Sequence, residues 1–281
     1  MRVIRQFFRL LRNTLFHREQ RTGSILVKPH RVSTPLMPSV SVDAGIWLDQ
    51  ARTCSGIGEW KRARDCATKA IEINPTLVEA YEIRAVAFRV MGELDCAIKD
   101  YSSVVEIDPQ QGDAWMFRGA CKTQKASRHG RHEAINILND AHSDYKRACE
   151  LMPDNERAAG ALLELEICAS KYREAVGTAG SWWHRVRTVD DKLVFAWLGG
   201  IAFILAGKPS QKWVHFQDFL ESEPAKLNPR DWSLAEMNGK IAELSKMVSE
   251  GRIEEQRLSE VRNVHRLFLS HFSGDGPVIQ Q

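Results

Sequence analysis

The chain has 281 residues, of which 43% are hydrophobic and 27% are charged, with a net charge of +3. This composition excludes a largely disordered chain, because it supplies enough apolar side chains for a core, and the length allows one or two domains. The six cysteines form no C-x-x-C pair, which argues against a disulfide framework and favours a reducing compartment such as the cytoplasm.

Residues 1–21 predict a basic amphipathic helix. Arginine recurs at a spacing of three or four residues, which places it on one helical face, while apolar side chains fill the other face. The arginines are Arg2, Arg5, Arg9 and Arg12, and the apolar side includes Phe7 and Phe8. Residues 1–32 hold eight Lys or Arg and one acid, a net charge of +7, so the rest of the chain carries −4.

Three interpretations of this N-terminal arm stay open. It is a helix that lies at an anionic membrane surface, an organelle presequence of the mitochondrial type, or a helix that docks against the body. Residues 22–42 then lose helical periodicity and place Pro29, Pro35 and Pro38 among Ser and Thr, a composition typical of a flexible linker.

Three later segments share a pattern that ends in proline: Ala70–Pro75, Val104–Pro109 and Ala148–Pro153. The first two prolines are 34 residues apart, and the third follows 44 residues later, which is one period plus ten residues. A large aromatic residue and a small residue recur at matched places before each proline: Trp47, Tyr81 and Trp115, then Ala51, Ala85 and Gly119. A period of 34 residues is that of stacked helix pairs, and with these residue types the chain resembles the tetratricopeptide-repeat family.

The resemblance implies an all-α fold, an α-α superhelix of antiparallel helix pairs over residues 43–229, with three clear and two degenerate units. The apolar run Leu193–Ala206 is too short to span a membrane, so we expect it to be a buried helix of the fifth unit. Residues 230–272 predict two amphipathic helices, which either cap the last apolar face or associate with a partner or a second copy. Residues 273–281 are expected to be a disordered tail.

The ten extra residues of the third unit fall near Gln124–Ile137. The segment Ser127–His132 is polar and contains a glycine, so we predict a loop between the two helices of this unit. Insertions in repeat arrays lie on one face, and whether this one contacts a partner stays open.

In the family that the chain resembles, the first helix of each unit lines a concave groove that binds a protein or peptide. The matching residues here combine apolar and charged side chains: Leu48, Arg52, Glu79, Glu82, Val86, Arg89, Asp113 and Met116. This combination favours an amphipathic helix or an extended peptide with positive charge. Where the family usually has Leu, the chain has Gln50, Arg84 and Arg118, which implies a more polar groove.

One subgroup of the family grips the C-terminal carboxylate of chaperones with Lys, Asn and Arg. The matching positions in this chain are Leu48, Arg52, Ile83, Asp113 and Phe117. None of them matches the subgroup, and Asp113 would repel a carboxylate, so we do not expect that ligand.

Signatures of an enzyme or a cofactor site are missing from the sequence. No P-loop and no G-x-S-x-G motif occurs, and His129, His132 and His142 do not make up the four ligands that a zinc site usually needs. Segment Ser181–Arg187 mixes tryptophan with positive charge, but the acidic body argues against nucleic-acid binding.

We therefore expect a non-enzymatic protein-interaction scaffold without a metal or cofactor. It would be cytoplasmic, with peripheral membrane contact through residues 1–21 as an option. The alternative is an organelle-targeted or membrane-associated assembly factor, mitochondrial for example, in which the basic arm is the targeting element.

Overall fold

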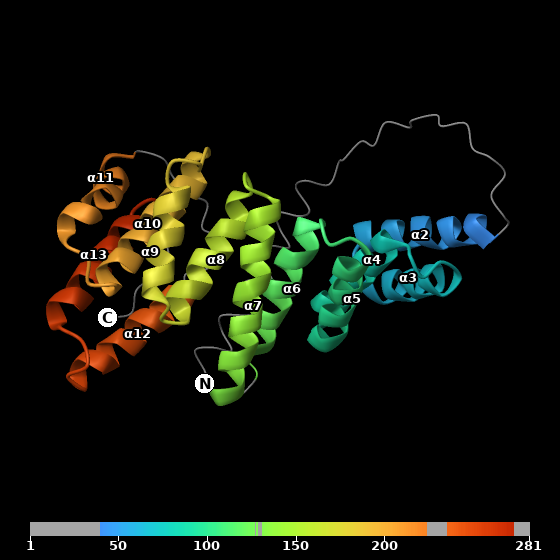
Figure 1. The fold of residues 1–281 in the computed structure, drawn as a ribbon, viewed down its shortest axis with the longest axis horizontal. Helices are drawn as coiled ribbons and strands as arrows, with labels where there is room; N and C mark the ends of the chain where they lie inside the picture. Colours follow the sequence, from blue (N-terminus) through green and yellow to red (C-terminus); the bar gives the residue numbers. More distant parts are fainter. Residues whose placement is uncertain (1–39, 127, 129–130, 224–234, 273–281) are drawn as a thin grey trace.

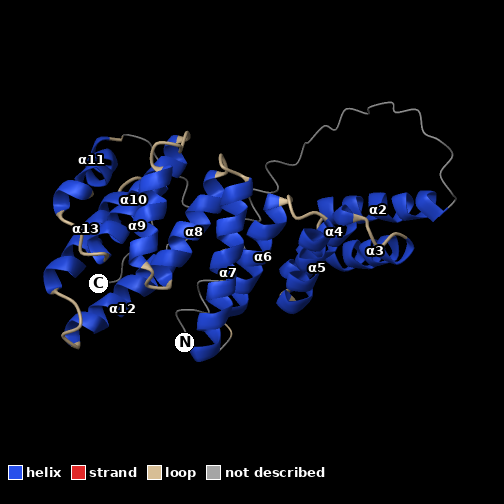
Figure 2. Cartoon of the chain, viewed as in Figure 1, coloured by secondary structure: helices blue, strands red, loops and turns tan. Residues whose placement is uncertain are grey.

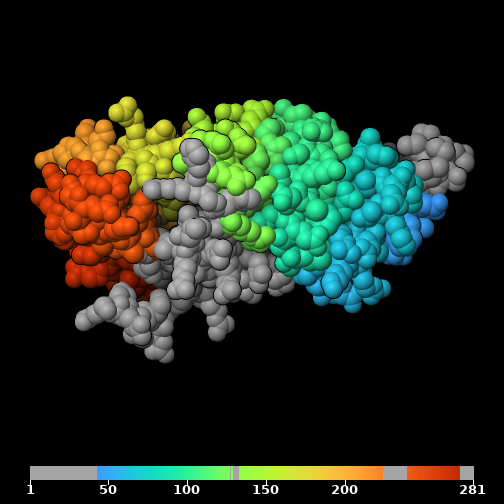
Figure 3. All heavy atoms as spheres, turned by 90° about the horizontal axis from the view of Figure 1, so that it is seen from below, coloured from blue at the N-terminus to red at the C-terminus, as the bar shows by residue number. Residues whose placement is uncertain are grey.

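The computed structural model describes residues 40–126, 128, 131–223 and 235–272, and within them the chain is a row of antiparallel helices (Figure 1). Short turns join most neighbouring helices (Figure 2), and the surface runs from α2 and α3 (blue) through α6 and α7 (green) to α13 (red) in Figure 3. The first three pairs are α2 and α3 (Val40–Gly56, Trp60–Ile73), α4 and α5 (Val78–Met91, Leu94–Ile107), and α6 and α7 (Gly112–Ala126, Arg131–Leu151). The later helices are α8 (Glu156–Cys168), α9 (Tyr172–Trp182), α10 (Val189–Leu205), α11 (Val214–Ser222), α12 (Ala235–Ser249) and α13 (Glu255–Leu269). The predicted all-α fold is confirmed.

Small residues let the two helices of each pair approach closely. Ala51 on α2 and Ala63 on α3 are fully buried, and Ala85 and Ala97 repeat this arrangement in the next pair. At Gly119 on α6 a Cβ atom would lie 3.3 Å from the carbonyl oxygen of a residue on α7, so a larger side chain would push these two helices apart. The predicted nesting of the helices at these positions is confirmed.

Glycine and the residue before proline determine where the helices end. Gly58 and Gly92 follow α2 and α4 with φ angles of 80° and 81°, a left-handed conformation that glycine adopts at little cost. Asn74 and Asp108 end α3 and α5 with extended backbone, the conformation that a following proline favours. The same pair of turns therefore recurs in successive units.

The C-terminal half is built around α10. Nearly every residue of this helix is buried, and it contacts α8, α9, α11 and α13. The prediction that the apolar run of this region is a buried helix is therefore confirmed. Among the helices that the structure describes, none combines the length and the hydropathy that a membrane crossing requires.

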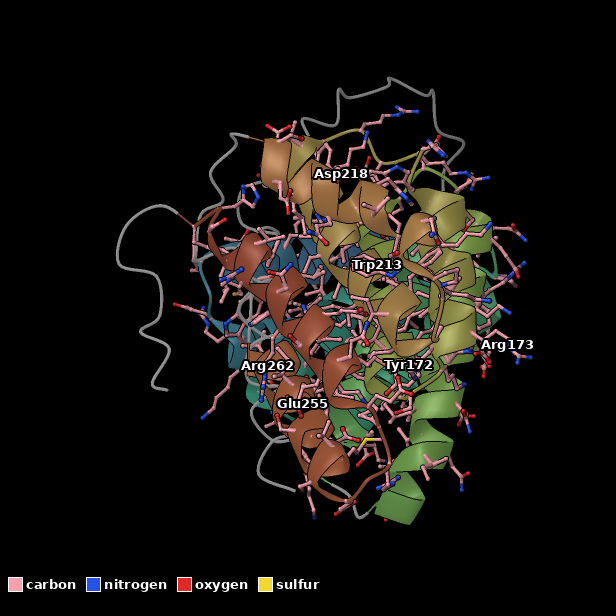
Figure 4. All side chains as sticks on the ribbon, turned by 90° about the vertical axis from the view of Figure 1, so that its left-hand side faces the viewer. Tyr172, Arg173, Trp213, Asp218, Glu255 and Arg262 are labelled. Atoms are coloured by element: carbon pink, nitrogen blue, oxygen red, sulfur yellow. The ribbon has the colours of Figure 1, made fainter. Side chains whose placement is uncertain are left out.

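Helix α13 covers the last helix pair of the array. Phe268 stacks on Trp197 of α10, with ring centroids 4.2 Å apart. Figure 4 looks onto this end of the molecule, where the labelled side chains of Glu255 and Arg262 on α13 and Asp218 on α11 are exposed. The end of the array is therefore polar on the outside and apolar on the inside, as a capping helix requires.

The structure corrects the predicted insertion loop in the third unit. Residues 124–126 belong to α6 and residues 131–137 belong to α7, so only residues 127–130 lie between the two helices. Helix α7 has 21 residues, whereas α5 has 14. The apolar residues Ala134, Leu138 and Ala141 recur at helical spacing on a buried or half-buried side, and this pattern extends the helix.

One other predicted boundary differs slightly from the structure, and two predicted segments lie outside the described residues. Helix α2 begins at Val40, so the last three residues of the predicted linker 22–42 are helical. The predicted arm at residues 1–21, with its six candidate membrane or targeting residues, lies outside the described residues, as does the predicted tail at residues 273–281.

Candidate functional site

The first helices of the three clear units carry carboxylates close to one another. We call the exposed and half-buried side chains of this surface the acidic face: Asp49, Arg52, Glu79, Glu82, Val86 and Asp113. Arg52 on α2 donates hydrogen bonds to both carboxylate oxygens of Glu79 on α4, and to Oδ1 of Asp49 at 2.6 Å. These bonds raise the pKa of Arg52, with the hydrogen bond to Glu79 as the main cause.

Glu82 on α4 is a half-buried carboxylate of the acidic face. It accepts one hydrogen bond, from Nε2 of Gln111 at 3.1 Å. Burial is the main cause that raises the pKa of Glu82, and the negative charges of Glu79, Asp113 and Asp108 act in the same direction. Within the described residues no Lys or Arg pairs with Glu82 or with Asp113. The acidic face therefore holds carboxylates that a positively charged ligand would stabilise.

The structure separates the eight predicted groove residues into two groups. Leu48, Arg89 and Met116 are buried, with 7%, 3% and 3% of their surface exposed, so little of these three side chains is accessible. The guanidinium of Arg89 lies 5.6 Å from the ring centroid of Phe117, between α4 and α6. The other five predicted residues, Arg52, Glu79, Glu82, Val86 and Asp113, are accessible and belong to the acidic face.

The arginines that replace the family's usual leucine do not line this face. Arg84 on α4 forms a bidentate ion pair with Asp100 on α5, with both N–O distances at 2.8 Å, and also bonds to Oγ1 of Thr68 on α3 at 3.3 Å. The next unit repeats this pattern: Arg118 on α6 bonds to Asp144 on α7 at 3.0 and 2.7 Å and to Ser102 on α5 at 3.2 Å. We call these two sets the arginine ladder, because each arginine ties together three consecutive helices.

The role of these arginines does not follow from the repeat pattern. Their positions predict a more polar groove, whereas the structure turns them inwards, between helices. One signal was available: each arginine lies 16 residues from a hydroxyl side chain in the preceding helix. Asp49 and Gln111 were also missed, because they occupy positions that the family pattern does not assign to the groove.

The histidines and tryptophans that the sequence offers as other candidate sites either pack within the fold or lie outside the described residues. Among the described residues, no group of three His, Cys, Asp or Glu side chains could hold a metal ion. His142 instead bonds through Nε2 to Oε1 of Glu166 at 2.9 Å, and His129 falls outside the described residues. Trp182 is buried, and Trp183 packs edge-on against Phe216, so this pair belongs to the core.

No family model matches the chain. The curated relatives cover only part of it. The DnaJ homolog subfamily C member 7 homolog of Dictyostelium discoideum is 29% identical over 116 residues, 40% of this chain, and Protein NPGR2 of Arabidopsis thaliana is 22% identical over 102 residues, 36% of this chain. The chain spans about a fifth of the first relative and about a seventh of the second, at 20% and 14% of their lengths.

Solved structures match a larger part of the chain. MamA has a TM-score of 0.52 at 17% identity, with 64% of this chain and 91% of that chain covered. The TPR protein YrrB has a TM-score of 0.51 at 16% identity, with 63% of this chain and 84% of that chain covered. The repeating helix pairs, their turns and these likenesses define the class: a helical-repeat solenoid. Within that class, the chain has the tetratricopeptide-repeat fold.

Proposed function

We propose that this chain is a non-enzymatic interaction scaffold that binds a positively charged amphipathic helix or extended peptide on the acidic face. The proposal rests on two carboxylates, Glu82 and Asp113. In the described part of the chain, neither of them forms an ion pair with a Lys or Arg. The solved YrrB structure, which has the same fold, is described as a TPR protein with an unusual peptide-binding site, and this supports a peptide as the kind of ligand.

The surroundings of the two carboxylates suit an amphipathic ligand. Val86 and Val90 lie one turn apart on α4 and are half-buried, so they offer an apolar strip beside the charges. A ligand cation close to Glu82 would favour its ionised form, which burial and neighbouring carboxylates disfavour. Charge would therefore supply selectivity and the apolar strip would supply contact area.

A synthetic helical peptide with Lys on one face and Leu on the other, labelled with fluorescein, tests this proposal by anisotropy. We expect the intact chain to bind it, and the double reversal Glu79→Lys with Glu82→Lys to weaken binding at least about tenfold, because two attractive charges become repulsive. The matched control is Glu72→Lys with Glu106→Lys, which makes the same charge change at exposed positions of the second helices α3 and α5. Equal losses in both variants would contradict the proposal.

The sequence of the N-terminal arm supports a second proposal, which is binding to a membrane surface. Residues 1–21 combine a row of arginines with an apolar side, as peripheral membrane helices do, so we also propose contact with an anionic membrane surface. On this account the chain is cytoplasmic and partly membrane-associated, or mitochondrial if the arm acts as a presequence.

Sedimentation with vesicles rich in phosphatidylserine tests the membrane proposal. We expect the intact chain to sediment with these vesicles, and the variant with Arg2, Arg5, Arg9 and Arg12 changed to Glu to stay in the supernatant. Vesicles of phosphatidylcholine alone serve as the control, since they lack the negative charge. A wild-type chain that sediments with neither kind of vesicle would contradict the proposal.

A further inference from the structure

The acidic face and the N-terminal arm of the same chain have complementary charges. Four carboxylates and one guanidinium make up the charged part of the face, and the guanidinium of Arg52 is already engaged with Asp49 and Glu79. Residues 1–32 carry a net charge of +7 and the rest of the chain −4, so the excess positive charge of the chain lies in its first 32 residues. Opposite charges of this kind attract over several ångströms even in water.

The predicted helix of the arm would also have a length that fits the acidic face. If residues 1–21 form the predicted helix, the row from Arg2 to Arg12 spans about 15 Å. Helix α4 has 14 residues, about 21 Å, so the arginine row fits within the length of one first helix. In such a helix Phe8 lies at the edge of the arginine row, whereas Phe7 lies opposite it, so Phe8 is the ring that could reach Val86 and Val90 while the arginines meet the carboxylates.

The connection between arm and array is long enough for this contact. Helix α2, which contributes Asp49 and Arg52 to the acidic face, begins at Val40. A flexible linker of the length of residues 22–39, which the composition predicts, would have a root-mean-square span of about 25 Å and a maximal reach of about 60 Å. A tethered ligand of this kind has an effective concentration in the millimolar range, so even a weak intrinsic affinity fills the site.

We propose that residues 1–21 are an internal ligand of the array, which occupy the acidic face and compete with an external basic peptide. This proposal rests on the proposed function of the acidic face, and it adds that the arm of the same chain occupies that face in the absence of a partner. The arginines of the arm would then be hidden from a membrane while the arm is docked. An external ligand would release the arm, because both bind the same carboxylates.

Photo-crosslinking in the intact chain tests the contact directly. Phe8 is replaced by p-benzoylphenylalanine, the dilute protein is irradiated, and adducts are mapped by mass spectrometry. We expect intramolecular adducts on α4 and α6, and their loss when Glu79 and Glu82 are changed to Lys. Adducts confined to other helices, adducts between molecules only, or no adducts would each overturn the proposal.

A competition experiment separates this inference from the proposed function. The probe is a fluorescein-labelled synthetic peptide of residues 1–21, titrated into the intact chain and into the variant with Arg2, Arg5, Arg9 and Arg12 changed to Glu. We expect the variant to bind the probe at least about tenfold more tightly, because its own arm no longer competes.

The outcomes of this competition are distinct. If the lysine–leucine peptide binds the acidic face but the probe of residues 1–21 does not, the proposed function stands and the internal ligand is refuted. If the probe binds the intact chain and the variant equally, the contact between the arm and the acidic face of the same chain is refuted, and the proposed function again stands. If neither peptide binds, both proposals fail.

Discussion

At the scale of single residues, burial determines the protonation of His265 on α13. Its ring lies beside that of Trp197, with centroids 5.7 Å apart, and burial lowers the pKa of His265 to about 4. The imidazole is therefore neutral in the folded chain at neutral pH, whereas in the unfolded chain it takes up a proton near its ordinary pKa of about 6.5.

We expect this histidine to make the C-terminal half sensitive to acid. Its contribution to stability is complete above pH 6.5 and is lost as the pH falls towards 4, because only the unfolded state then binds the proton. The shift corresponds to roughly 3 kcal/mol of unfolding free energy. Urea unfolding at about pH 7.5 and about pH 4.5 measures this loss, which should be smaller in His265→Gln.

The matched control is the same substitution at an exposed histidine, His184→Gln, measured at the same two pH values. The same pH dependence in the wild type and in His265→Gln would contradict the assignment.

A second residue-scale prediction concerns the buried carboxylate of Glu166 on α8. Its side chain is 3% exposed, and its Oε1 bonds to Nε2 of His142 on α7, while its Oε2 has no hydrogen-bond partner among the residues that the structure describes. We expect His142→Ala to destabilise the chain by about 2–4 kcal/mol, because it leaves a buried carboxylate without its partner. The double variant His142→Ala with Glu166→Leu should recover most of the loss in urea unfolding. Failure to recover it would show that His142 acts through packing instead.

At the scale of elements, the arginine ladder holds successive units together. Arg84 is the ion-pair partner of Asp100, whose side chain is 4% exposed, whereas Asp144 is shared by Arg118 and by Lys122, at 2.7 Å from each. The two sets of bonds are alike in geometry. They differ in what remains beside the aspartate when the arginine is removed: Asp144 keeps Lys122, whereas Asp100 has no such second cation in the described residues.

We expect Arg84→Met to destabilise the chain by about 3–4 kcal/mol, since it strands a buried carboxylate, and Arg118→Met to cost less because Lys122 remains. Changing Arg84 together with Asp100 to Leu restores the family's usual residue type at the arginine position and should be close to neutral. Chemical denaturation of the three variants checks the order. Equal losses for the two single variants would contradict the account of the ladder.

The same elements show what could be predicted from the sequence. Helix pairs and their ends followed directly from the 34-residue period, because glycine and proline act on the backbone locally. The inward direction of Arg84 and the burial of Leu48, Arg89 and Met116 depend on how neighbouring helices pack, which periodicity does not contain. The insertion was misread because a short polar stretch with one glycine concealed the helical spacing of Ala134, Leu138 and Ala141.

At the scale of the whole molecule, the two halves of the array have different cores. The N-terminal units bury small clusters between successive pairs, such as Tyr101 on α5 with Ala114 and Cys121 on α6, and each unit contacts mainly its neighbours. The C-terminal half surrounds the apolar helix α10 with a single large cluster. This division leaves the first helices of the N-terminal units free to present a charged surface, while the C-terminal half provides a stable end to the array.

The most direct test of the acidic face is amide hydrogen exchange of the intact chain with and without the lysine–leucine peptide. The account predicts slower exchange in α2, α4 and α6 when the peptide is bound, and no slowing when Glu79 and Glu82 are changed to Lys. Slower exchange confined to the second helices α3, α5 and α7, or to the bundle around α10, would show that the partner binds elsewhere and would contradict the account.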